Sequence, residues 1–106
     1  MNTIENSAKI FVDRVTAHAL RHSQELWLDY AIEDQMLEEM SRHSEGAERI
    51  VKDILDNREE FDALFEKHLS KRIWYLVEEG FGRIEGESFP SFIPFSQTET
   101  NLDLDL

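Results

Sequence analysis

The sequence contains no cysteine, which excludes disulfide bonds, thiolate metal sites and thiol nucleophiles. It also has no apolar run of about 18 residues, the length that a membrane-spanning helix requires. The first residues lack the basic stretch followed by an apolar run that is typical of a secretory signal. We therefore expect a cytoplasmic protein with no membrane partner.

Basic residues are scarce as well. The 106-residue chain has 23 acidic residues against 11 lysines and arginines, which gives a net charge of −12. This charge disfavours direct binding to nucleic acid or to an anionic membrane, because like charges repel. Apolar residues nonetheless make up 41% of the chain, which is enough for one modest core and a single domain.

Glycine and proline, which interrupt helices, are few and unevenly placed. All four glycines and both prolines lie at or after Gly46. Up to residue 79, apolar residues recur at the three- and four-residue spacing of a helix face, and no segment shows sustained strand alternation. We therefore predict an all-α fold, with a small bundle of three to four helices over residues 1–80 and an extended acidic and aromatic tail over residues 81–106.

Local signals predict where these helices begin and end. Ser23 is a plausible N-cap for a second helix, although no breaker separates the first two segments, which could form one helix. Gly46 suits a helix end. Asn57 is predicted to cap the last helix, with Glu60 completing a capping box, and Gly80 is predicted to end it. The predicted helices span residues 4–19, 23–40, 47–55 and 57–79.

Sequence motifs for catalysis or cofactor binding are missing. His18 and His22 stand one helical turn apart, as a metal-binding pair would, but no Glu-x-x-His or His-Glu-x-x-His motif supplies further ligands. The stretch GFGRIEG imitates a nucleotide-binding loop, yet it follows a predicted helix and not the strand that such a loop requires. We expect no enzyme, and hence no catalytic residue, metal ion or cofactor.

Acidic residues concentrate in residues 25–66, which contain 14 acidic and four basic residues. Such carboxylates either form an ordinary solvated helix surface or imitate the phosphate rows of duplex DNA. The second interpretation predicts an inhibitor, for example an anti-defence or anti-CRISPR-like protein, that occupies the channel of a nucleic-acid-binding protein. The candidate residues for this acidic surface are Glu33, Asp34, Glu38, Glu39, Glu59 and Glu60.

A phenylalanine-rich segment, SFPSFIPF, covers residues 88–95. It either packs back across the helices, which would enlarge a small core, or presents Phe92 and Phe95 as aromatic anchors to a partner. We favour packing, although both interpretations stay open from the sequence.

The last six residues, NLDLDL, alternate leucine with aspartate. In an extended conformation, Leu102, Leu104 and Leu106 point to one side and the two aspartates point to the other. We call residues 101–106 the leucine strip. It suits an apolar groove on a partner protein; the alternative is a loose chain end without a function.

The leucine strip resembles the short peptides by which bacterial and phage proteins bind the DNA sliding clamp, which run Gln-Leu-x-Leu-x-Leu. Asn101 stands where glutamine is usual, and Leu102, Leu104 and Leu106 stand at the apolar positions. The strip also resembles the Leu-Asp-x-Leu ends of T4-type phage late-transcription co-activators, small acidic proteins that bridge the clamp and RNA polymerase. This resemblance implies a phage-encoded adaptor in transcription regulation that binds through these four residues.

Overall fold

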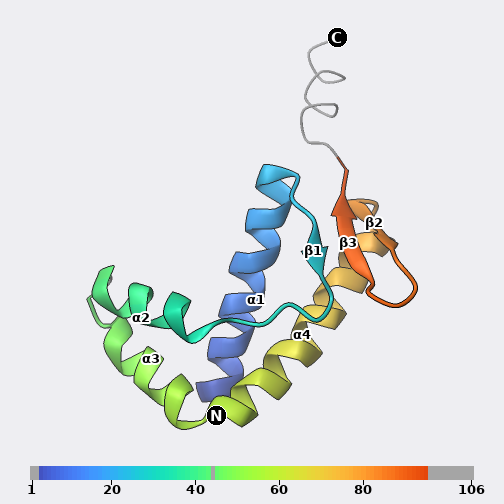
Figure 1. The fold of residues 1–106 in the computed structure, drawn as a ribbon. Helices are drawn as coiled ribbons and strands as arrows, with labels where there is room; N and C mark the ends of the chain where they lie inside the picture. The colour runs from blue at the N-terminus through green and yellow to red at the C-terminus, as the bar shows by residue number, and fades with distance from the viewer. Residues whose placement is uncertain (1–2, 44, 96–106) are drawn as a thin grey trace.

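A computed structural model describes residues 3–43 and 45–95 (Figure 1). Its helices are α1 (Thr3–His22), α2 (Asp34–His43), α3 (Ala47–Asp56) and α4 (Arg58–Glu78). Its strands are β1 (Leu26–Trp27), β2 (Gly82–Glu85) and β3 (Ser91–Pro94). The mainly helical fold is therefore confirmed, whereas the prediction of a purely helical one is wrong, because a small sheet is present.

The long helices α1 and α4 pack against each other and hold the centre of the core. The ring of Phe11 on α1 meets the ring of Phe61 on α4 edge to face, with their centroids 5.7 Å apart. Phe65, one turn along α4, lies 6.0 Å from Phe61 in a stacked arrangement. In Figure 1, α2 and α3 lie on the left of α1, whereas the sheet lies on the right, beside the C-terminal half of α4.

Helix α1 ends at a left-handed serine and does not continue into a second helix. Ser23 has a φ angle of 49°, and its N–H points to the carbonyl oxygen of Leu20 at 3.5 Å, while the N–H of Gln24 donates to Ala19 at 2.9 Å. These two bonds form a Schellman motif. The prediction of Ser23 as the N-cap of a helix over residues 23–40 is therefore wrong, because Ser23 closes the preceding helix and an extended segment follows.

The end of α4 follows the same pattern with glycine in the left-handed position. Gly80 has a φ angle of 85°, and the N–H groups of Gly80 and Phe81 donate to Val77 and Leu76 at 3.1 and 2.9 Å. The predicted stop at Gly80 is confirmed.

The corner between α3 and α4 departs from the predicted capping box. Asn57 makes no side-chain cap to α4; its Nδ2 donates backwards to the carbonyl oxygen of Asp53 at 2.9 Å. Asn57 therefore terminates α3 with its side chain. Gly46, predicted to end a helix, lies immediately before α3 with a φ angle of 87°.

Residues 82–94, predicted as part of an extended tail, form a β-hairpin that joins the helical body. The strand order is β1-β3-β2, with both pairs antiparallel, and Phe92 of β3 pairs with Leu26 of β1 and Ile84 of β2. The side chain of Phe92 is fully buried in the core. Part of the phenylalanine-rich segment therefore packs back on the helices through Phe92, whereas Phe89 and Phe95 are exposed. The folded structure extends beyond the predicted boundary at residue 80.

Among the residues that the structure describes, no helix combines the length and the apolar character needed to cross a membrane.

Candidate protein-docking groove

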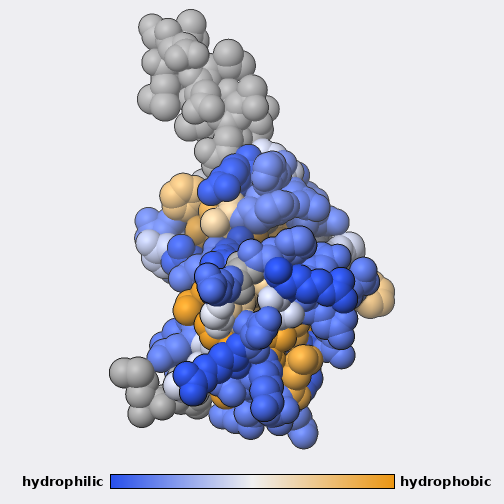
Figure 2. All heavy atoms as spheres, turned by 90° about the vertical axis from the view of Figure 1, so that its left-hand side faces the viewer, coloured by the Kyte–Doolittle hydropathy of each residue, from blue (hydrophilic) through white to orange (hydrophobic). Residues whose placement is uncertain are grey.

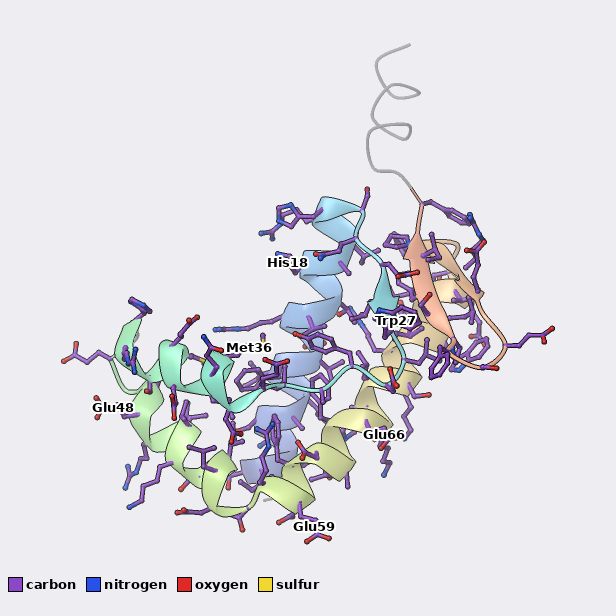
Figure 3. All side chains as sticks on the ribbon, viewed as in Figure 1. His18, Trp27, Met36, Glu48, Glu59 and Glu66 are labelled. Atoms are coloured by element: carbon purple, nitrogen blue, oxygen red, sulfur yellow. The ribbon has the colours of Figure 1, made fainter. Side chains whose placement is uncertain are left out.

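An apolar groove of about 640 Å³ runs between α1, α2 and the segment that connects them. We call it the docking groove. Figure 3 labels one lining residue from each side: His18 on α1, Trp27 on β1 and Met36 on α2. The full lining consists of Phe11, Arg14, Val15, His18, Ala19, Gln24, Glu25, Leu26, Trp27, Tyr30, Ile32, Met36 and Met40.

One wall of the docking groove is a face of α1. Phe11, Val15 and Ala19 recur every four residues, so that they form a continuous apolar stripe along the helix. Phe11 and Ala19 are buried, and Val15 is half-buried. Arg14 and His18, also one turn apart, place two exposed polar side chains along this wall. The wall therefore combines an apolar stripe with groups that can bind a carboxylate or a backbone carbonyl.

A second wall is the segment around β1, which the hairpin holds in place. Leu26 and Trp27 pair with Phe92 and Ser91 of β3, and the hydroxyl of Ser91 donates to Oε2 of Glu25 at 3.0 Å. Trp27 keeps 43% of its surface exposed. A half-exposed tryptophan on a backbone fixed by hydrogen bonds would lose little conformational freedom on binding another molecule.

The third wall is formed by α2 and the residues just before it. The side chain of Met36 is 42% exposed, and the hydroxyl of Tyr30 donates to its Sδ at 3.5 Å. Burial, with the nearby carboxylate of Glu33, raises the pKa of Tyr30, so its phenol stays protonated and can donate. The carbonyl oxygen of Ile32 accepts from Nη2 of Arg58 on α4, which ties this wall to the helical body.

The docking groove has two methionines, Met36 and Met40, in its lining. The side chains that line it are mainly apolar, and methionines can adapt to partners of different shape. His18 and His22 lie with ring centroids 4.4 Å apart, but residues 3–43 and 45–95 contain no group of three or more histidines and carboxylates that could hold a metal ion.

The residues predicted to bind a partner are spread over different parts of the chain. Asn101, Leu102, Leu104 and Leu106 lie outside the described residues. Phe92 is 0% exposed, so its ring is part of the core in this fold and is not a free anchor. Phe95 is 44% exposed and follows β3, where its N–H donates to the carbonyl oxygen of Phe81 at 2.9 Å.

The predicted acidic surface comes from two helices that meet near Arg58. Glu33 lies just before α2, and Asp34, Glu38 and Glu39 lie on it. Glu59 and Glu60 lie in the first turn of α4, and all six side chains are exposed. Arg58 lies 3.6 Å from the Asp34 carboxylate and 3.3 Å from that of Asp62. Figure 3 shows Glu48 pointing outwards at the left of the molecule and Glu59 pointing outwards at its lower edge, and Figure 2 shows a mostly hydrophilic surface interrupted by apolar patches.

Sequence reasoning did not find the docking groove. The predicted helix over residues 23–40 contains both Trp27 and Met36, because the stop of α1 at Ser23 carries no glycine that would mark it in the sequence. No local pattern marks the groove, because its lining comes from three separate elements. Comparisons with protein families, curated proteins and solved structures found no match to this chain.

Proposed function

We propose that this protein is a non-enzymatic adaptor that binds one partner through the docking groove and another through the leucine strip. The observation that carries the proposal is the docking groove, a preformed, largely apolar surface with a half-exposed tryptophan and methionine. The resemblance of the leucine strip to clamp-binding peptides supports the DNA sliding clamp as one partner. By the same resemblance, RNA polymerase is the proposed second partner.

Two weak contacts suit such an adaptor better than one strong contact. Fully burying one leucine contributes about 1.5–3 kcal/mol, and the ordering of chain and side chains on binding subtracts from the sum. The groove and the strip are therefore each expected to bind weakly. When both partners belong to one complex, the second contact forms at a high effective concentration and strengthens the whole assembly.

The test uses purified bacterial sliding clamp and RNA polymerase, each titrated with the full chain. Replacing Leu104 and Leu106 together by alanine should abolish clamp binding and leave polymerase binding unchanged. Trp27→Ala should weaken polymerase binding and spare clamp binding. Phe89→Ala is the matched control, because Phe89 is 71% exposed and lies outside the docking groove.

The proposal is wrong if neither protein binds the full chain, or if the two sets of substitutions have the same effect on both partners. Thermal melting of each variant shows whether a loss of binding comes from unfolding.

The alternative function is a DNA-mimicking inhibitor. The observation that favours it is the ion pair between Arg58, at the start of α4, and Asp34, at the start of α2, together with the exposure of all six carboxylates on and beside these two helices. Its target would be a protein with a basic DNA-binding channel.

A further inference from the structure

A second cleft, of about 300 Å³, lies on the seam between α1 and α4. We call it the basic cleft. Lys9, Val12 and Asp13 line it from α1, and the lining from α4 comprises His68, Lys71, Arg72 and Tyr75. None of these residues lines the docking groove, so the two surfaces are separate.

The charge of the basic cleft is opposite to that of the whole protein. The chain carries a net charge of −12, yet three cations and one carboxylate line this cleft. The segment KHLSKR, residues 67–72, contains three of the 11 lysines and arginines and no acidic residue. Because salt screens charges beyond about 8 Å at physiological ionic strength, a small ligand in the cleft would interact mainly with these nearby cations.

The cations on α4 are not neutralised by the abundant acidic residues. Within residues 3–43 and 45–95, neither Lys71 nor Arg72 forms an ion pair, whereas Lys9 lies 3.6 Å from Glu5. Both side chains are exposed, and both line the same cleft, which also holds the carboxylate of Asp13. An anion that enters the cleft would be attracted by both cations, because neither is already paired with a carboxylate among the described residues.

The geometry of Arg72 adds a recognition element. Its guanidinium carbon lies 5.4 Å from the centre of the Tyr75 ring, so the planar group rests on an aromatic face. A guanidinium oriented in this way can donate two parallel hydrogen bonds to a phosphate or carboxylate.

His68 forms the inner part of the basic cleft. Its side chain is 15% exposed, and its Nε2 lies 3.7 Å from Oε1 of Glu5, too far for a hydrogen bond. Nε2 is buried without a hydrogen-bond partner among the described residues. A buried polar atom without a partner is rare in folded proteins. At this seam between α1 and α4, the described residues do not supply the hydrogen bond that Nε2 of His68 could make.

We propose that the basic cleft binds a phosphate group, held by Lys71 and Arg72 with Lys9 at the opposite side. The ligand is inorganic phosphate or a small phosphomonoester and not a nucleic acid, because the rest of the chain repels a polyanion while a single phosphate meets mainly the cleft. Tyr75, which is 49% exposed, offers an aromatic face beside the phosphate position.

The experiment follows the full-length protein by NMR during titration with inorganic phosphate, with sodium chloride adjusted to keep the ionic strength constant. Saturable shifts are expected in the amides of residues 9–13 and 67–75 and in the His68 ring. Replacing Lys71 and Arg72 together by glutamine should weaken binding by about tenfold or more, because two charge-assisted hydrogen bonds are lost. The matched control replaces Arg42 and Lys52, exposed cations on α2 and α3, by glutamine and changes the net charge equally.

Each outcome decides the proposal. Binding that the control variant keeps and the cleft variant loses supports it. If both variants lose binding equally, or if phosphate causes no saturable shift, the proposal is wrong. A parallel titration with adenosine monophosphate distinguishes the two candidate ligands. Tighter binding of adenosine monophosphate than of phosphate indicates that the natural ligand is a phosphomonoester, and equal binding indicates free phosphate. A duplex oligonucleotide that binds more tightly than either would contradict the assignment to a small ligand.

Discussion

Single residues set the limits of the elements, and Ser23 shows how. A left-handed conformation costs a residue with a β-carbon about 1–2 kcal/mol relative to a right-handed one. Ser23 adopts it with a φ angle of 49°, because the two hydrogen bonds that end α1 require it there. The turn that leads the chain from α1 towards the docking groove is therefore strained at one residue.

Ser23→Gly should relieve this strain. We expect the free energy of unfolding to rise by about 0.5–1 kcal/mol, which is the left-handed penalty less the entropy that glycine adds to the unfolded chain. Urea denaturation measures the change. Ser41→Gly, in the last turn of α2, is the control and should lower stability; a loss of stability in both variants would contradict the explanation.

His68 makes stability depend on pH. Burial lowers the pKa of His68 below its usual 6.5; Lys9, Lys67 and Lys71 lower it further, and Glu5 acts in the opposite direction. The unfolded chain therefore binds a proton at a higher pH than the folded chain does. Stability from this group is complete above about pH 6.5 and is lost as the pH falls through the lowered folded-state pKa.

The measurement compares the unfolding free energies of the wild type and His68→Gln between pH 5 and pH 8. Because glutamine does not titrate, the difference between the two proteins should change below pH 6.5, with the wild type losing more stability towards low pH. A difference that stays constant over this range would show that His68 has the same pKa in the folded and unfolded states.

At the scale of the element, the hairpin fixes the docking groove through close backbone contact. A β-carbon on Gly82 would lie 2.5 Å from the carbonyl oxygen of Ile93 and 2.5 Å from the Phe92 ring. Gly82 thus lets β2 approach β3 closely, and β3 in turn pairs with β1, which carries Trp27.

Gly82→Ala should therefore destabilise the protein by about 1–3 kcal/mol, the usual cost of overpacking. It should also change the emission of Trp27, recorded in a Trp74→Phe background that leaves Trp27 as the one tryptophan. Glu87→Ala, in the exposed turn of the same hairpin, serves as the control. An unchanged melting temperature in the Gly82 variant would mean that the hairpin is not needed for stability.

The helices were more predictable than the sheet for a physical reason. In α3 and α4, buried residues such as Ile54, Phe61 and Phe65 follow the helical period, and a glycine marks the end of α4. The strands are only two to four residues long, too short to show alternation, and β3 is flanked by Pro90 and ends at Pro94. Their pairing depends on residues far apart in the sequence, which no local pattern records.

For the whole molecule, salt dependence separates the two proposed functions. Binding through the docking groove is mainly apolar, so we expect partner affinity to change by less than about tenfold between 50 and 200 mM salt. A protein that replaced DNA in a basic channel with 6–10 phosphate-like contacts would lose about 10³–10⁵-fold over that range.

The matching substitutions are Glu33, Glu38 and Glu39 to glutamine and Asp34 to asparagine, combined in one chain. We expect this variant to keep partner binding, because these side chains lie outside the docking groove. Loss of binding together with competition by duplex DNA would favour the inhibitor instead.

The pairing of β1 with β3 also orders events during synthesis. Glu25 and Ser91, which hydrogen-bond beside the docking groove, are 66 positions apart, so this contact closes a loop that contains α2, α3 and α4. Such a distant contact forms slowly compared with a helix. On the ribosome, moreover, α1 to α4 emerge before β3 does, and the wall that carries Trp27 cannot form its strand pairing until Phe92 has left the exit tunnel. The docking groove of a nascent chain is therefore incomplete until almost all of the described residues have left the exit tunnel.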